Sequence, residues 1–599
     1  MQRPMHVRRV RPSAPSALVL LLVVLVASCQ FVFPVPPAGA PVPDLLFTLS
    51  EPEPVAGEFT VTVTAQNLDA TEVWFRLDTL NGAPFSVDGE APFTLTLNTR
   101  ELAAGPHTIW AGTSDHTYSV QKKRTLAFNI RPNIVVVQLD DLDQVGTPYW
   151  DAMPQTRALL ADAGLTFENA FVTDPLCCPS RASSLTGRYP HNTGVYDNSG
   201  PDGGYSGFAA ASEGDTLATR LQVEGYTTAY LGRYLNGYNP GTHGVRPGWN
   251  EWFGLDQGVW WNGYAYNANH NGVLEPYGWQ PEDYETDVLS GQADMFVGAA
   301  ESDDPRPFFV YLNPLAPHAN IGPAQRHQPN PFGEAQLPTR PNFNEADVSD
   351  KPTWIRDGFP LLGEDALAAE TVMYREAIGS LLAVDDMIAS LVDTLAEHGE
   401  LDRTIIVFTS DNGLNRRAHR LNHKMAPYEE SVRVPFVMRG PGVPVGSDDH
   451  LVTNIDLAPT VLHLAGAGDQ PDLDGRSIVP LLLAEEVTWR NDFLIELRAT
   501  NQSPPSFDTL QDVQDAIAAN GSLGYVPTYR AVRDEQWLYV EWYGGTVHEY
   551  ELYELSTDPY QLTNLLSTPE GVTEHAALTA TLQSRLEELG ACSGPLCRS

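Results

Sequence analysis

Ile134-Val135-Val136-Val137-Gln138-Leu139-Asp140-Asp141 is the stretch that decides the fold, because it joins a buried apolar run to two adjacent acids. Three similar apolar runs follow along the chain, at residues 227–231, 308–312 and 404–408. Between the last two runs, residues 370–398 place apolar side chains at the spacing of one helix face. Strands that alternate with helices predict an α/β fold, in which a mostly parallel sheet carries helices on both faces.

Each of the four runs leads into a polar cluster. The clusters are Asp140-Asp141, Gly232-Arg233, Pro317-His318 and Ser410-Asp411-Asn412-Gly413. Ligands of such sheets bind at the carboxyl ends of the strands. One acidic pair after a strand is usually a turn or a helix cap, but four converging clusters indicate a single functional site.

A second informative stretch lies between the first and second runs, Cys177-Cys178-Pro179-Ser180-Arg181-Ala182-Ser183-Ser184-Leu185-Thr186-Gly187-Arg188. Pro179 suits the first turn of a helix, so Cys177 is expected at or just before a helix N-terminus, where an anion is stabilised. A free cysteine there could be a thiolate nucleophile with a lowered pKa. A disulfide between the adjacent Cys177 and Cys178 would be strained, which indicates another role for at least one of them.

Cys-x-Pro-Ser-Arg at residues 177–181, followed by Leu-Thr-Gly-Arg at residues 185–188, resembles the signature of type I, formylglycine-dependent sulfatases. This family belongs to the alkaline-phosphatase-like superfamily, and the resemblance extends over residues 132–599. It implies an alkaline-phosphatase-like fold and a sulfuric ester hydrolase. It also implies that a separate formylglycine-generating enzyme oxidises Cys177 to formylglycine, while Cys178 fills a variable position of the motif.

The resemblance further implies a metal site. The matching ligands are Asp140, Asp141, Asp411 and Asn412. Four oxygen donors without sulfur or imidazole suit a hard divalent cation, Ca²⁺ or Mg²⁺.

Four other residues match catalytic positions of the family. Arg181 would steady the formylglycine hydrate, Lys424 would bind sulfate, and His318 would protonate the leaving alcohol. Arg233 stands where most members have lysine, and arginine keeps the charge and can hold sulfate through two donors. Leu235 stands where many members have histidine.

Three segments resemble one branch of the family, the N-acetylglucosamine-6-sulfatases and the extracellular heparan 6-O-endosulfatases. They are the double cysteine, residues 187–192 (Gly-Arg-Tyr-Pro-His-Asn) and residues 233–236 (Arg-Tyr-Leu-Asn). The expected substrate is a sulfated carbohydrate such as 6-O-sulfated N-acetylglucosamine. Three alternatives stay open: shared ancestry with another substrate, a phosphonate monoesterase or phosphodiesterase on the same site, and an inactive glycan-binding protein.

The net charge of the chain limits its binding partners, and its N-terminal residues indicate its cellular location. The 599 residues hold 36 Lys and Arg against 76 Asp and Glu, a net charge of −40, which argues against binding nucleic acid or an anionic membrane surface. Residues 1–29 read as a signal peptide, because the apolar run 17–27 is too short to cross a bilayer. Val26-Ala27-Ser28-Cys29 resembles a lipobox, which implies lipidation of Cys29 at a bacterial cell envelope; simple secretion is the alternative.

The rest of the chain divides into four parts. Residues 30–43 form a Pro-rich linker, residues 44–131 an immunoglobulin-like β-sandwich, residues 132–500 the catalytic domain, and residues 501–599 a C-terminal subdomain with a small antiparallel sheet. The sandwich is either a spacer or a glycan-binding module. Cys592 and Cys597 are expected to form a small disulfide loop.

Two groups of residues have more than one interpretation. The aromatic segment 249–279 could be a sugar-stacking wall, but aromatic strands packed on the sheet are the commoner arrangement. His191 and His423 could reach the site, whereas His419 is expected to be exposed or structural.

Overall fold

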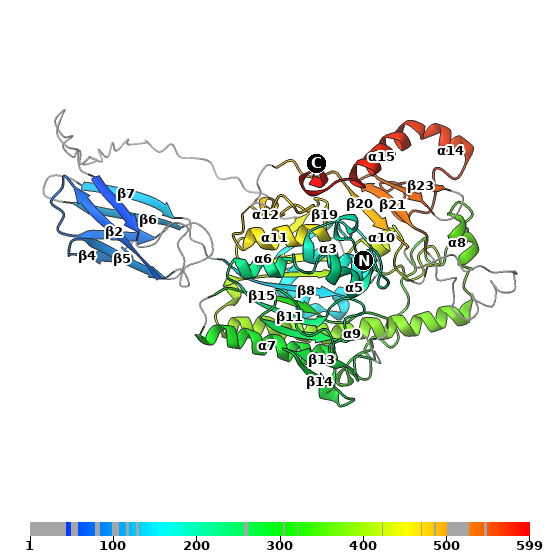
Figure 1. The fold of residues 1–599 in the computed structure, drawn as a ribbon, viewed down its shortest axis with the longest axis horizontal. Coiled ribbons are helices and arrows are strands. Elements are labelled where there is room, and N and C mark those ends of the chain that lie inside the picture. The colour runs from blue at the N-terminus through cyan, green and yellow to red at the C-terminus, as the bar shows by residue number, and fades with distance from the viewer. Residues whose placement is uncertain are drawn as a thin grey trace, which may run out of the picture. The chain divides into compact units, whose positions relative to one another are not determined.

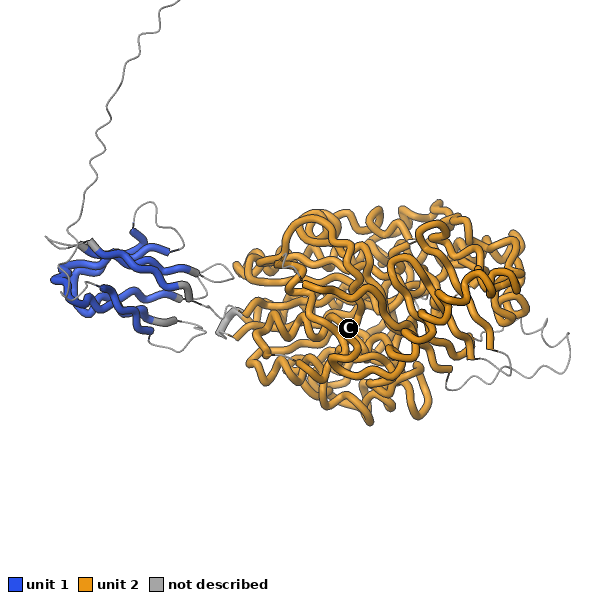
Figure 2. The backbone as a smooth tube through the Cα atoms, turned by 90° about the horizontal axis from the view of Figure 1, so that it is seen from above, with its two compact units in different colours: residues 1–52, 59–97, 107–126 blue, residues 53–58, 98–106, 127–599 orange. Residues whose placement is uncertain are grey.

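The computed structural model describes residues 44–49, 58–77, 84–98, 107–114, 119–126, 131–145, 147–256, 262–303, 306–319, 321–421, 423–468, 470–483, 487–499, 526–543 and 548–598. The predicted signal peptide and Pro-rich linker lie outside these residues. Two compact units are present, an N-terminal unit within residues 1–126 and a larger unit that includes residues 127–599 (Figure 2). No helix among the described residues has the length and apolar character needed to cross a membrane.

A ten-stranded sheet forms the centre of the larger unit, in the order β14-β13-β12-β11-β15-β8-β16-β17-β9-β18. The four predicted runs are its central strands, β8 (Asn133–Leu139), β11 (Thr227–Arg233), β15 (Phe308–Asn313) and β16 (Thr404–Ser410), and they pair in parallel. The outer strands are β9 (Leu165–Phe167), β12 (Glu251–Leu255), β13 (Asn267–His270), β14 (Val273–Pro276), β17 (Phe436–Arg439) and β18 (Gly446–Asp448). The predicted mostly parallel sheet is confirmed.

Helices cover both faces of this sheet (Figure 1). Ile134 and Val136 of β8 pack with α3 (Cys177–Thr186), α6 (Leu217–Val223) and α11 (Leu457–Leu464), whereas Val135 and Val137 pack with α7 (Glu285–Asp303) and α9 (Glu364–Glu397). Successive strand residues point to opposite faces, so a strand covered on both sides must be apolar throughout. The helix predicted at residues 370–398 is α9, which begins six residues earlier.

A second sheet completes the larger unit. It is antiparallel, in the order β20 (Asp492–Leu497), β21 (Tyr529–Asp534), β22 (Trp537–Trp542) and β23 (Glu549–Glu554). One face packs on α15 (Ala576–Leu589), as Figure 1 shows. The first strand of this sheet, β20, lies before residue 501, where the C-terminal subdomain was predicted to begin.

Short elements connect these layers. They are α1 (Tyr149–Ala152), α2 (Pro154–Thr156), α4 (Pro190–Thr193), α5 (Gly204–Ala211), α8 (Thr353–Gly358), α10 (Glu429–Val432), α12 (Val479–Leu482), α14 (Pro569–Glu574), β10 (Ala170–Phe171) and β19 (Val452–Thr453).

The N-terminal unit consists of two small sheets. One contains β1 (Asp44–Leu49), β2 (Glu58–Gln66) and β5 (Phe93–Asn98), and the other β4 (Ser86–Asp88), β3 (Val73–Leu77), β6 (His107–Ser114) and β7 (Ser119–Leu126). In these sheets β1 pairs with β2, β3 with β4 and β6, and β6 with β7, all antiparallel. Alternate apolar side chains, such as Val61, Phe75 and Ile109, are fully buried. The predicted β-rich N-terminal part is confirmed, and its immunoglobulin-like character stays a prediction.

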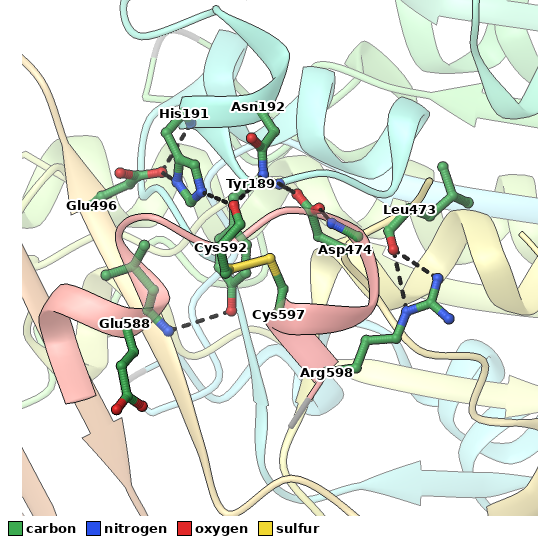
Figure 3. The surroundings of a disulfide bond; sticks show 12 residues. Tyr189, His191, Asn192, Leu473, Asp474, Glu496, Glu588, Cys592, Cys597 and Arg598 are labelled. Carbon is green, nitrogen blue, oxygen red and sulfur yellow. Dashed lines mark hydrogen bonds and ion pairs between the residues drawn. A yellow bond between two sulfur atoms is a disulfide. The ribbon is translucent and has the colours of Figure 1, made fainter. Parts of the chain in front are cut away.

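The predicted disulfide joins Cys592 and Cys597, and its loop packs on the segment that follows α3 (Figure 3). The carbonyl oxygen of Cys592 lies 3.0 Å from Nε2 of His191 and accepts a hydrogen bond from Asn192. Asp474 accepts hydrogen bonds from the backbone N–H groups of Tyr189 (2.8 Å) and Gly594 (2.7 Å). The C-terminus therefore holds the chain just beyond the helix that begins at Cys177.

His191 must carry a positive charge to satisfy both of its ring contacts. Its Nδ1 lies 2.6 Å from Oε1 of Glu496 and its Nε2 faces the Cys592 carbonyl, and both of these groups accept hydrogen bonds only. Burial lowers the pKa of His191, but the hydrogen bond and charge of Glu496 outweigh it and raise the pKa above its ordinary value of 6.5.

The His191→Gln variant should therefore lose stability in a pH-dependent way. A raised pKa in the folded state contributes stability that is complete below pH 6.5 and is lost as pH rises through the folded pKa. We expect a loss of about 1–3 kcal/mol at pH 6 and a smaller loss at pH 9, measured by denaturant unfolding. His463→Gln, at an exposed position on α11, is the control; an equal loss at both pH values in His191→Gln would contradict the expectation.

Candidate active site

Arg181, on α3, ties together the carboxyl ends of the four central strands. Its Nε donates to Oδ2 of Asp411 (2.8 Å), after β16, and its Nη2 donates to Oδ2 of Asp140 (3.3 Å), after β8. Its Nη1 donates to Oδ1 of Asn313 (3.1 Å), which ends β15, and to the backbone oxygen of Arg233 (3.2 Å), which ends β11. The convergence predicted from the four runs is therefore present around one guanidinium.

Arg181 stays protonated, and therefore positively charged, in this environment. The residue is only 2% exposed. Burial by itself would lower its pKa, but the carboxylate of Asp411 raises the pKa above the ordinary value. Arg181 is thus a permanent cation, and its five N–H groups fix the positions of the side chains and backbone around it.

Two buried oxygen atoms of the predicted metal ligands accept no hydrogen bond. Among the described residues, Oδ1 of Asp140 and Oδ1 of Asn412 are buried and have no partner. The amide of Asn412 donates to Oδ1 of Asp141 (2.7 Å), which identifies its free end as oxygen. Ligand atoms of Asp140, Asp141 and Cys177 all lie within 4.8 Å of one another. Buried acceptors without donors fit a hard cation, and the donor set is that of Ca²⁺ or Mg²⁺.

Cys177 is the first residue of α3, as predicted, and it contacts Lys424. Nζ of Lys424 lies 2.7 Å from Sγ of Cys177 and also pairs with Asp141. Burial raises the pKa of Cys177 to about 12, although the charge of Lys424 opposes the shift. The pKa therefore argues against the thiolate that a free cysteine at this position could have formed, because burial outweighs the charge of the lysine.

His318 and Arg233 are the remaining two residues that the sequence predicts at the active site. Arg233 forms an ion pair with Asp140, and burial lowers its pKa to about 10, so it remains charged at neutral pH. Nε2 of His318 lies 3.7 Å from Oδ2 of Asp141. Burial lowers the pKa of His318 to about 4 despite the nearby Asp141 carboxylate, so the ring is neutral at neutral pH.

All nine predicted catalytic and metal-binding residues thus lie in one connected network, whereas none of the three additional histidines has a side-chain contact with it among the described residues. His191 belongs to the C-terminal loop contact. His419 is buried and structural, with Nδ1 2.7 Å from Oε2 of Glu345. His423 reaches the site only through the backbone, because its Nδ1 contacts the carbonyl oxygen of Lys424 (2.7 Å).

The aromatic segment packs mostly into the core. Trp249 and Trp252 are buried against the sheet in one cluster with Tyr230 and Tyr311. Trp279 is exposed. Trp260 and Trp261 lie outside the described residues. The core interpretation therefore holds for Trp249 and Trp252, and the sugar-stacking wall stays a prediction for the rest of the segment.

Asn313 is a site residue that the sequence reasoning missed. Arg181 can only donate, so the atom of Asn313 that faces it must be the oxygen, and Nδ2 points elsewhere, buried and without a partner among the described residues. The signal was available: Asn313 is the first polar residue after the third apolar run.

Solved structures with the same architecture define the class. One is titled BT4656 in complex with its substrate D-glucosamine-2-N,6-O-disulfate; it is 23% identical, has a TM-score of 0.63, and the match covers 76% of this chain and 97% of that one. A phosphonate monoester hydrolase of Agrobacterium radiobacter is 20% identical, with a TM-score of 0.55 and coverage of 77% and 95%. These likenesses show an alkaline-phosphatase-like fold.

Sequence comparison then gives the family. The family model described as Sulfatase matches residues 132–467. N-acetylglucosamine-6-sulfatases of Capra hircus and Homo sapiens are 35% and 34% identical; each match covers 78% of this chain, and 85% and 86% of the two relatives. The chain belongs to the sulfatase family, and it is a sulfuric ester hydrolase.

Replacing Asn313 should impair turnover more than stability. In Asn313→Ala, Nη1 of Arg181 loses its side-chain acceptor, and we expect kcat to fall about 10–100-fold with little change in KM, measured on nitrophenyl sulfate. Ser183→Ala is the matched control, because Ser183 is buried on α3 and its hydroxyl has no partner among the described residues. Equal kcat values for Asn313→Ala and the native enzyme would contradict the role.

Proposed function

We propose that this sulfatase removes 6-O-sulfate from N-acetylglucosamine units of sulfated sugars, using a divalent cation and a formylglycine formed from Cys177. The observation that supports the proposal is the arrangement around Arg181, where Cys177, Arg233 and Lys424 lie in one network with the oxygen-bearing side chains of Asp140, Asp141, Asp411 and Asn412. The 6-O-sulfated substrate is supported by the N-acetylglucosamine-6-sulfatases, which are similar over most of this chain.

The protein's own residues would share the work of sulfate cleavage. Lys424 and Arg233 supply positive charge for the sulfate oxygens, and Arg181 holds Asp140 and Asp411 in place. We infer that His318 contacts the ester oxygen and protonates the leaving alcohol, because a bound anion raises the pKa of a neighbouring imidazole.

Two groups beyond the encoded side chains complete the proposed chemistry. A Ca²⁺ or Mg²⁺ ion held by Asp140, Asp141, Asp411 and Asn412 would supply positive charge to the sulfate. Formylglycine at position 177 would supply a hydrated aldehyde as the nucleophile, in place of the thiol that burial keeps protonated.

The two adjacent cysteines should differ sharply when replaced. Cys177→Ala should abolish turnover, because Sγ of Cys177 faces Lys424 in the site. Cys178→Ala should retain much of the activity, since Cys178 packs in the core and its backbone N–H donates to Asn198 (2.9 Å). Mass spectrometry of the native peptide should find formylglycine at 177; equal losses in both folded variants would contradict the assignment.

Removing the cation should affect both activity and stability. Chelation, or Asp411→Ala, should lower turnover about 10²–10³-fold, because charge stabilisation at the sulfate is lost. Chelation should also lower the melting temperature of the native enzyme, since loss of a ligand bound to the folded state destabilises it. Added Ca²⁺ or Mg²⁺ should reverse this shift, and Asp411→Ala should no longer respond to the chelator. Full activity in exhaustively chelated, metal-free protein would rule the site out.

Substrate preference is tested with defined esters. We expect sulfate release from 6-O-sulfated glucosamine oligosaccharides to exceed release from 2-O- and N-sulfated ones, and nitrophenyl sulfate to be cleaved faster than nitrophenyl phosphate mono- and diesters. Faster hydrolysis of the phosphate diester would favour the phosphodiesterase alternative. Cleavage restricted to small aryl sulfates would reject the sugar substrate.

We also propose that the enzyme is exported and is lipidated at Cys29 in a bacterial cell envelope. Similar proteins of Drosophila melanogaster and Caenorhabditis elegans carry names that describe them as extracellular sulfatases, which supports export. The segment ending in Val26-Ala27-Ser28-Cys29 supports the anchor. Mass spectrometry of the mature N-terminus decides between a lipidated Cys29 and a free product of simple secretion.

A further inference from the structure

The outer face of the sheet β4-β3-β6-β7 in the N-terminal unit presents a row of aromatic and basic side chains. Val73, Phe75, Ile109 and Ala111 point inward and are fully buried, so their neighbours along each strand point outward. The strand register places Arg76 opposite Trp110, and Trp110 opposite Lys123. We call the outward residues Trp74, Arg76, Trp110 and Lys123 the Trp-Lys face.

The two indole rings of this face lie beside its cations. Trp74 sits over Gly112 of the next strand, where any Cβ would overlap the ring, so glycine at 112 lets the indole lie flat on the sheet. The guanidinium of Arg76 lies 4.3 Å from the ring centre of Trp74, and Nζ of Lys123 lies 5.2 Å from that of Trp110. Both rings remain partly accessible, and Lys123 is exposed.

The charge of this face is opposite to that of the protein. The whole chain has a net charge of −40 and only four lysines, yet Lys122 and Lys123 stand together on β7. Within their described spans, β3, β6 and β7 contain no acidic residue, and Asp88 of β4 lies opposite the inward-pointing Val73 rather than on the outer face. Arg76 and Lys123 are the basic side chains of the Trp-Lys face, whereas Lys122 and Arg124 lie opposite the inward-pointing Ala111 and Ile109 and point to the other side of the sheet. A polyanion would therefore meet attraction here and repulsion over much of the remaining surface.

We propose that the Trp-Lys face binds a sulfated polysaccharide, independently of the active site. Flat indole rings offer surfaces on which sugar rings stack, and the adjacent cations pair with sulfate groups. Because the larger unit is a sulfuric ester hydrolase, a polymer held on this face would also be a source of its substrate.

The experiment uses the full mature chain and a heparin dodecasaccharide as the probe. Binding is measured by calorimetry in a Cys177→Ala background, so that the probe is not consumed. We expect Trp110→Ala to weaken binding about tenfold and Lys123→Gln to weaken it about threefold, as expected for loss of one stacking ring or one exposed cation. In the active enzyme, both substitutions should leave turnover of nitrophenyl sulfate unchanged.

Lys122→Gln is the matched control for Lys123→Gln. Lys122 is the neighbouring lysine, but it points to the other side of the strand and pairs with Asp44 (2.9 Å). Its replacement should leave heparin binding unchanged. If Trp110→Ala fails to fold, Lys123→Gln still tests the proposal, because its side chain is exposed.

Four results would overturn the proposal. They are unchanged heparin binding in both Trp-Lys variants, an equal loss in Lys122→Gln, equal affinity for unsulfated N-acetylheparosan, and loss of binding to phosphatidylglycerol vesicles while heparin binding persists. The last result would assign the face to an anionic lipid surface. Because turnover of the small ester is measured separately, failure here is distinct from failure of the proposed catalytic function.

Discussion

The site depends on the buried guanidinium of Arg181, which donates hydrogen bonds to residues at the ends of four strands. Arg181 donates hydrogen bonds of 2.8–3.3 Å to side-chain or backbone oxygen atoms at the carboxyl ends of β8, β11, β15 and β16. A planar group with five fixed donors imposes directions as well as distances, which an ammonium group does not. A helix that supplies this cation to the sheet therefore also fixes the place of its own first residue, Cys177.

The balance of charge around Arg181 shows why the site suits an anion. Three cationic side chains, Arg181, Arg233 and Lys424, face the three carboxyl groups of Asp140, Asp141 and Asp411. With all six ionised, these side chains are neutral together, so a divalent cation would leave the site with two positive charges. A singly charged sulfate ester would then be attracted into a site within a protein whose net charge is −40.

The fold and the site could be predicted from the sequence to different degrees. Strands buried on both faces leave long apolar runs, and polar residues at their ends stand out, which is why β8 and Asp140-Asp141 were recognisable. Asn313 was not recognised, since a single amide after an apolar run looks like an ordinary strand end until its contact with Arg181 is seen. The raised pKa of Cys177 was not predictable, because a motif places a helix start but does not show how deeply the packing will bury it.

The burial of Cys177 also limits the order of events during biosynthesis. Its side chain is almost inaccessible in the folded protein, and the loop closed by Cys592 and Cys597 packs beside the end of the same helix. An enzyme that oxidises this sulfur, as proposed above, would reach it before the chain folds and not afterwards. Lys424, which contacts this sulfur, lies 247 residues further along the chain and is synthesised later. The chain therefore passes through a period in which residue 177 is already made and the contacts that enclose it are still incomplete.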